Sequence, residues 1–435
     1  MSPHRISPSL PPVRVRIPGP SGPPGGPSGL RRRTGPALAA AWLLTRAVML
    51  VLLAVDRLGD TGVAGEVGLL YRGWYDQWLA RGSFPAGDVT WQYPPGAGLV
   101  LLAPGAVPFL SYFHAFVALV LLCDAVITLA LARAARTGRT ASGTGPDAVG
   151  GTDGGTGSAA GAWLWVAGLP LLLNLPLARY DVPVTAVAVL ALLALRRRPL
   201  AGGALAGLGA MIKVWPVLTL LGTPRGRTTK EAWGAAAAAA AGLLAVLVLL
   251  FDGALGFLRQ QGARGVQIES LGGTVLQLAH RAGWDGRVVY QYGAMEFTGP
   301  YVPSVARLAL ALTAAAFCWL LFWRLRARRW TPATPFDAAF TAVLLFTVTS
   351  RVISPQYLVW LLGLAAVCLA CRETVLRPAA LLMAPAAAVS ALAYPLNYDE
   401  VIGATVPGCA LMVVRNGLLL AAAVLACRRL WRSTV

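Results

Sequence analysis

Apolar runs long enough to cross a membrane recur along almost the whole chain, and short arginine clusters separate them. Hydrophobic residues occupy 57% of the 435 positions, while charged residues occupy 13%. Soluble domains carry about 25% charged residues, so this composition excludes an ordinary water-soluble fold. The sequence therefore predicts an all-α, polytopic membrane protein.

The net charge of +19 comes from basic residues that lie in short runs between apolar segments, not on a basic domain with an element that could read a nucleic-acid groove. We therefore expect no nucleic-acid partner. Short cytoplasmic loops are enriched in Arg and Lys, so we place every basic cluster inside. This gives about twelve spans in a multi-pass plasma-membrane protein with both termini in the cytoplasm. The spans lie near 37–55, 111–132, 161–178, 182–195, 200–212, 214–222, 232–251, 303–323, 335–350, 356–370, 376–394 and 404–426.

Five segments differ from the other apolar spans in composition or length. Residues 1–36, rich in Pro, Gly, Ser and Arg, predict a disordered cytoplasmic tail before a single domain at 37–430, and residues 137–161 predict a flexible cytoplasmic linker. The apolar stretch 96–109 is too short to cross, so it is interpreted as re-entrant or interfacial. The pair 200–212 and 214–222 is also short, which leaves Lys213 either at the outer surface or at the tip of a buried helical hairpin.

The unusual polar segments all fall on the outer side in this topology. They are the loop 56–95, the turn Arg179–Asp181, the loop 252–302, the corner 351–355 and the loop 395–403. A transporter is expected to keep its polar residues near the membrane midplane. Long loops with aromatic and acidic residues above a helical base fit an enzyme better.

Group transfer from a lipid phosphate needs a carboxylate that takes the acceptor proton and cations that steady the departing phosphate. Asp181 stands out among the outer acids because it lies at a membrane boundary, although a pair with neighbouring Arg179 is an alternative. Arg46 lies inside the first span and needs an anion, either a lipid phosphate or Asp124, of which the salt bridge with Asp124 is favoured. The other outer candidates are the acids Glu66, Asp76 and Asp88 and the cations Lys213, Arg264 and Arg351.

Two further segments carry candidate binding groups. Gln267 and Glu269 are two apart on a short extended segment, so both can hydrogen-bond one polyol, although helix capping by Glu269 or Ser270 explains the pattern equally well. Gln356 follows Pro355 at the start of a span, where free amide groups could meet a phosphate. The alternative there is an ordinary capped helix end.

Several of these segments together resemble actinobacterial members of glycosyltransferase family 87, polytopic enzymes of the GT-C fold. The motifs are TWQYPP with Tyr93, ARYD at 178–181, IKVWP at 212–216, RGVQIES at 264–270, SRVISPQYLVW at 350–360 and Arg415-Asn416. They occur in the family's order, and the resemblance runs from about residue 37 to 430.

The resemblance implies an inverting transfer of a hexose, commonly mannose, from a polyprenyl-phosphate sugar to a lipid or glycan acceptor outside the plasma membrane. It implies no cofactor and no metal. It also implies a catalytic acid in the first outer loop, where relatives have Asp, an apolar residue and then Tyr at the fourth position. Here the acid is Glu66 and Tyr71 follows at the fifth position, so Glu66 is the expected base, with Asp60 as second choice. The competing class is a transporter or flippase of a lipid-linked sugar.

The candidate site residues divide by role. Glu66 and Asp181 are the candidate catalytic acids. The candidate substrate-binding residues are Arg46, Tyr93, Lys213, Arg264, Gln267, Glu269, Arg351, Gln356 and Arg415.

Overall fold

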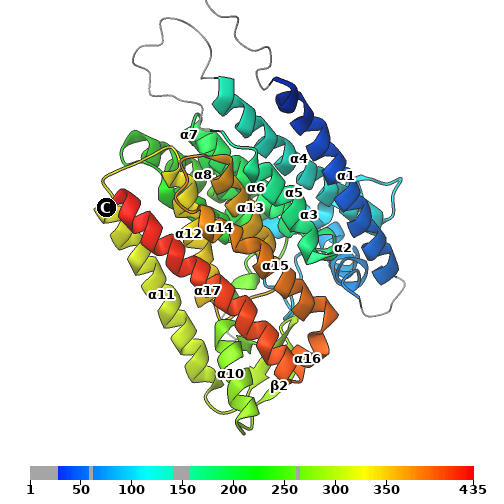
Figure 1. Ribbon diagram of the computed structural model, residues 1–435. Helices are drawn as coiled ribbons and strands as arrows, with labels where there is room; N and C mark the ends of the chain where they lie inside the picture. The colour runs from blue at the N-terminus through cyan, green and yellow to red at the C-terminus, as the bar shows by residue number, and fades with distance from the viewer. Residues whose placement is uncertain (1–27, 58–61, 141–156, 261–264) are drawn as a thin grey trace, which may run out of the picture.

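The computed structural model describes residues 28–57, 62–140, 157–260 and 265–435 (Figure 1). Within these ranges, six helical stretches are long and apolar enough to cross a membrane. They are α1 (Ser28–Arg57), α4 (Tyr112–Thr140), α8 (Arg227–Leu250), α11 (Val302–Arg326), the stretch 377–396, and α17 (Val406–Thr434). The chain is an all-α, polytopic membrane protein, as its composition predicts.

Shorter helices form the centre of the bundle. Almost every residue of α6 (Asp181–Leu195), α12 (Thr334–Thr349) and α13 (Tyr357–Ala370) is buried. By contrast, α8 and α11 expose most of their apolar residues, and Figure 1 shows α1 and α11 on opposite edges of the bundle. Apolar residues cover these helices all round, so the outer ones suit a hydrocarbon solvent and the inner ones suit a protein core.

The remaining elements are short. The helices are α2 (Arg72–Gln77), α3 (Gly96–Leu102), α5 (Ala160–Gly168), α7 (Pro199–Ile212), α9 (Phe257–Gln260), α10 (Leu271–Arg281), α14 (Arg377–Leu381), α15 (Met383–Ala391) and α16 (Tyr398–Ile402). The π-helical segments are η1 (Glu66–Tyr71) and η7 (Leu392–Leu396). The 3-10 segments are η2 (Leu79–Arg81), η3 (Ala103–Ala106), η4 (Leu169–Leu172), η5 (Leu175–Ala178) and η6 (Trp215–Gly222).

A small antiparallel sheet, absent from the predicted elements, lies in the loop 252–302. Its strands are β1 (Val266–Gln267), β2 (Arg287–Gln291) and β3 (Ala294–Thr298), in the order β1-β3-β2. Figure 1 shows β2, α10 and α16 at one end of the bundle and the C-terminus at the other. Backbone hydrogen bonds from Phe84 to Asp252 and from Gln267 to Arg351 join three of the polar segments predicted to share one side.

The structure corrects one boundary and decides one alternative. Helix α1 begins at Ser28, so a helix replaces the end of the disordered tail predicted for 1–36. The linker predicted for 137–161 lies mostly outside the described residues. Its first residues are helical, because α4 continues to Thr140. Lys213 sits between α7 and η6 with a side chain only 12% exposed, so it lies at the tip of a buried hairpin.

Helices α7 and α8 cross at glycines four residues apart. A Cβ atom on Gly203 would lie 2.1 Å from the Ala232 carbonyl oxygen, and one on Gly207 would lie 2.2 Å from that of Ala236. This small-xxx-small spacing lets two backbones approach within a membrane, where apolar burial alone does not drive helices together.

Replacing Gly207 by Val is therefore expected to destabilise the bundle by about 2 kcal/mol, because the added side chain meets backbone that cannot move aside cheaply. Thermal unfolding in detergent measures the loss. The matched control is Gly242→Val on α8, where a Cβ atom would meet nothing within 4 Å. Equal unfolding temperatures for the two variants would contradict the close crossing.

Candidate active site

Two ion pairs meet at the ARYD turn. The Lys213 ammonium nitrogen lies 2.5 Å from an Asp181 carboxylate oxygen, and Arg179 Nη1 lies 3.4 Å from Glu66 Oε2. Asp181 is 1% exposed, and Glu66 is 24% exposed. Arg179 therefore pairs with the loop acid, not with Asp181 as the alternative interpretation held. One tripeptide thus joins an acid from the first loop to a lysine from the α7–η6 hairpin.

Prolines interrupt the helices on either side of these charged residues. Proline cannot continue a helical hydrogen-bond ladder, so α5 gives way to η4 at Pro170 and to η5 at Pro176 before α6 begins at Asp181. Pro216 likewise follows the extended backbone at Lys213, where α7 ends. The helix breaks leave Asp181 and Lys213 facing each other in the interior.

Aromatic rings surround the Lys213 ammonium group. It lies 4.6 Å from the ring centroid of Tyr180, 4.8 Å from that of Trp360 and 5.7 Å from that of Tyr357. The Trp360 indole N–H also donates to the Asp181 carboxylate at 2.5 Å. Ring faces attract a cation, so the rings help to hold the ammonium group in place. These aromatic residues belong to the ARYD and SRVISPQYLVW motifs, but no local pattern in the sequence indicates that their rings meet at Lys213.

Glu66 begins a π-helical turn that ends at Tyr71. The Arg72 amide donates to the Val67 carbonyl, which is the i to i+5 bond of a π-helix. A π-bulge absorbs one extra residue, so the fifth-position Tyr71 still reaches the ARYD turn. Its ring centroid lies 6.0 Å from that of Tyr180, while Glu66 contacts Arg179. Glu66 and Tyr71 are thus both directed at the same turn.

The start of this turn is held by Asp56, at the end of α1. Its carboxylate accepts hydrogen bonds from the backbone amides of Val63 at 3.2 Å and Ala64 at 2.7 Å. The position of Glu66 therefore depends on α1.

Several buried polar atoms at the two ion pairs have no hydrogen-bond partner among the described residues. They are the hydroxyls of Tyr71 and Tyr180, Nε of Arg179 and Oδ2 of Asp181. Burial, and next the charge of Glu66, raises the pKa of Tyr71 well above its usual value, so its hydroxyl stays protonated and can donate. Buried polar groups are nearly always satisfied, so a cluster of unsatisfied ones indicates a place for a polar ligand.

The other acids of the first loop are engaged differently. Asp88 accepts from the Trp74 indole at 2.8 Å and from the Thr90 hydroxyl at 2.6 Å. Burial favours a higher pKa for Asp88, but these hydrogen bonds overcome it and lower the pKa, so the group is a structural anion. Asp76 forms an exposed pair with Arg72 at 3.3 Å. Asp60 lies outside the described residues.

A second buried cluster lies where β1 leads into α10. Arg415 Nη1 is 3.6 Å from Glu269 Oε2, and Arg415 also donates to the Glu269 carbonyl oxygen. Ser270 is the N-cap of α10, since its hydroxyl accepts from the Gly273 amide at 2.8 Å, which decides the capping question in favour of Ser270. Oε1 of Gln267 and Oε2 of Glu269 are buried without a hydrogen-bond partner among the described residues.

The remaining predicted site residues fall in three places. Tyr93 joins the first cluster, with its ring centroid 5.2 Å from that of Tyr180. The Arg351 carbonyl accepts from the Gln267 amide at 3.0 Å, so this corner adjoins the second cluster, and Gln356 precedes α13 next to it. Arg264 lies outside the described residues.

Arg46 belongs to a separate network. Its Nε is 2.8 Å from Asp124 Oδ2, and its Nη1 donates to the Val166 carbonyl at 2.7 Å. The salt bridge with Asp124 is confirmed. The structure does not bring Arg46 together with the other predicted binding residues.

Burial raises the pKa of Glu269 to about 7, with Arg415 acting in the opposite direction. The folded protein therefore holds this proton from about pH 4.5 up to about pH 7, while the unfolded chain releases it. The stabilisation is complete below the unfolded value and is lost as pH rises through the folded value. Stability of the wild type relative to Glu269→Gln is expected to fall by about 3 kcal/mol from pH 4.5 to 7, as measured by thermal unfolding. Parallel pH curves for the two proteins would contradict this.

Comparison with known proteins identifies the family of the chain. The model of glycosyltransferase family 87 matches residues 91–355, more than half of the chain. The matched region contains Asp181, Lys213, Gln267, Glu269 and Arg351 and begins after Glu66. No curated protein and no solved structure matches the chain. The family match, the membrane-length helices and the clustered ionic residues lead to one identification: the chain belongs to glycosyltransferase family 87 and is a membrane glycosyltransferase.

Proposed function

We propose that this enzyme has the GT-C fold and transfers a hexose, mannose in the first instance, from a polyprenyl-phosphate sugar to a lipid or glycan acceptor on the outer side of the plasma membrane. The observation that carries the proposal is the meeting of the Glu66–Arg179 and Asp181–Lys213 pairs at one turn. An acid with partial exposure and a buried cation are the two groups that such a transfer requires.

Glu66 is the proposed general base. It is more exposed than Asp181, and Arg179 orients its carboxylate. In a single displacement, the acceptor oxygen bonds to the anomeric carbon while the bond from that carbon to the phosphate oxygen breaks. The acceptor proton passes to Glu66, and polyprenyl phosphate leaves. Attack opposite the leaving group inverts the anomeric centre.

Lys213 is the proposed phosphate ligand, with Arg351 and Arg264 as the other candidates. Asp181 accepts one hydrogen bond from the lysine, which leaves ammonium hydrogens for a phosphate oxygen, and Trp360 fixes the Asp181 carboxylate. Asp181 thereby acts as a positioning residue, and its free Oδ2 makes it the second acid to test as base.

Gln267 and Glu269 are the proposed contacts for sugar hydroxyls at the second cluster, with Gln356 as a further candidate. Tyr93 is the proposed contact at the first cluster. The unsatisfied oxygens of Gln267 and Glu269 are the groups that accept hydrogen bonds from a polyol. Arg415 positions Glu269 through a hydrogen bond to its carbonyl oxygen and an ion pair with its carboxylate.

The proposed orientation makes a labelling prediction. With the arginine clusters inside, a cysteine at exposed Gly87 should react with an impermeant thiol reagent in intact cells, whereas one at exposed Arg372 should react only after permeabilisation. Protein without an added cysteine supplies the background, since Cys318 is exposed. Labelling of both sites in intact cells, or the reverse pattern, would refute the orientation.

The activity itself is tested with purified protein in detergent. Polyprenyl-phosphate mannose and a membrane lipid extract should yield a new mannosylated lipid, and Glu66→Gln should yield far less. Absence of product with any polyprenyl-phosphate hexose would contradict the proposed donor class.

A lipid-linked sugar transporter is the second candidate, because Asp181 and Lys213 lie at breaks in short helices inside the bundle. Transporters build substrate sites from such broken helices. The detergent assay distinguishes the enzyme from the transporter, because a transporter forms no glycosidic bond.

A further inference from the structure

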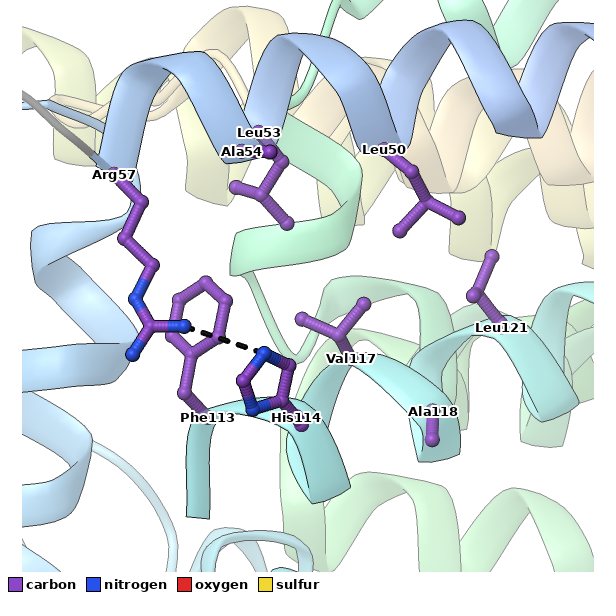
Figure 2. Close-up of a pocket in the computed structure, with 9 residues that line it drawn as sticks. All are labelled: Leu50, Leu53, Ala54, Arg57, Phe113, His114, Val117, Ala118 and Leu121. Carbon is purple, nitrogen blue, oxygen red and sulfur yellow. Dashed lines mark hydrogen bonds between the residues drawn. The ribbon is translucent and has the colours of Figure 1, made fainter. Parts of the chain in front are cut away.

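An apolar groove of about 500 Å³ lies between α1 and α4 (Figure 2), and no residue of the two polar clusters lines it. Leucine, alanine, valine and phenylalanine side chains line most of its length, and two polar residues, Arg57 and His114, also line it. Figure 2 shows these two together at one end and Leu50 and Leu121 toward the other. The groove is therefore amphipathic along its axis.

The polar end is organised to receive an anion. Arg57 Nη1 lies 3.3 Å from His114 Nε2, and the Arg57 guanidinium lies 4.3 Å from the Phe113 ring centroid. A guanidinium only donates, so Nε2 accepts from Arg57, and Nδ1 carries the proton that reaches the Ser111 hydroxyl at 2.7 Å. Within the described ranges, no carboxylate pairs with Arg57. A phosphate at this end of the groove would form a charge-assisted hydrogen bond with the Arg57 guanidinium.

The surroundings decide what fills the apolar part. Both helices are of membrane-crossing length, and only 22% of the apolar window of α1 is buried. A groove on such a helix faces hydrocarbon and not water, so an acyl chain is its natural occupant. A phosphate attached to that chain then lies at the polar end, at the level of the lipid headgroups.

We propose that this groove binds an anionic glycerophospholipid, with an acyl chain along Leu50, Ala54 and Leu121 and the phosphate against the Arg57 guanidinium, which His114 orients. None of the proposed donor, base or sugar ligands lines it. The site is therefore additional to the proposed function and does not depend on it.

The position of the groove suggests what the bound lipid does. Arg57 directly follows Asp56, which caps the backbone just before Glu66. A lipid held by Arg57 would steady the end of α1 and, through Asp56, the turn that carries the proposed base.

The test is native mass spectrometry of purified protein titrated with phosphatidylglycerol, without any sugar donor. Arg57→Met removes the charge but keeps much of the stem, and it is expected to weaken binding about fivefold. Ala118→Trp, at an exposed lining position, fills the groove and should weaken binding at least as much. Two controls keep native affinity: Arg307→Met on exposed α11 surface and Leu122→Trp on α4 outside the groove.

The outcomes are decisive in either direction. Weakening in both groove variants, with native affinity in both controls, supports the site. Native affinity in either groove variant, equal weakening in the controls, or displacement of phosphatidylglycerol by polyprenyl phosphate at equal concentration overturns it. The last result would assign the groove to the sugar donor's lipid. Because no transfer is measured, failure here leaves the proposed reaction untouched, and failure of the transfer assay leaves this site untouched.

Discussion

Replacing Glu66 by Gln is expected to lower turnover by about a hundredfold or more while donor binding survives. The amide keeps the shape of the side chain and can still hydrogen-bond near Arg179, but it cannot take the acceptor proton. Steady-state rates at saturating donor and acceptor measure the loss. Glu66→Asp should retain part of the activity because it keeps a carboxylate.

The matched control for Glu66→Gln is Asp76→Asn in the same loop. Asp76 is an exposed partner of Arg72, so its loss should change turnover little. If Glu66→Gln transfers sugar at the normal rate, Glu66 is not the base. Asp181→Asn then becomes the decisive variant.

Replacing Lys213 by Met is expected to weaken use of the donor by roughly 2–4 kcal/mol in kcat/KM, because a desolvated contact to the departing phosphate is lost. The dependence of rate on donor concentration measures it. The same change leaves the buried Asp181 carboxylate without its cation, which destabilises the fold by about 3–5 kcal/mol.

A double variant separates these two effects. Lys213→Met combined with Asp181→Asn removes both charges, so much of the lost stability should return. Use of the donor should stay weak, because the phosphate still lacks its cation. Recovery of donor use in the double variant would show that Lys213 only neutralises Asp181.

Hydropathy and charge pattern alone predicted most of the helical architecture. The predicted span 182–195 corresponds to α6 at 181–195, and the predicted span 303–323 lies within α11 at 302–326. Membrane helices are readable in this way because each must satisfy its own backbone and carry apolar side chains over a defined length. The sheet β1-β3-β2 was not predicted, because short strands with mixed burial show no clear alternation of apolar and polar residues.

Several candidate site residues could also be identified from the sequence. Burying a charged residue at a membrane boundary or inside an apolar run costs free energy. The sequence alone therefore identifies Asp181, Lys213 and Arg46 as candidates. This free-energy cost does not distinguish a residue that binds substrate from one that forms a structural salt bridge. Arg46 is as buried as Asp181, yet the structure places it in a closed network with Asp124.

The pairing of charges was decided only by tertiary structure. Arg179 and Asp181 are two apart in sequence, but the turn sends one toward Glu66 and the other toward Lys213. Partners 113 and 32 residues away cannot be chosen from local sequence, because which residues meet depends on how the helices pack. The π-helical turn at 66–71 is similar: the sequence places Tyr71 five residues after Glu66, and only the folded backbone shows that this turn directs both residues at the ARYD turn.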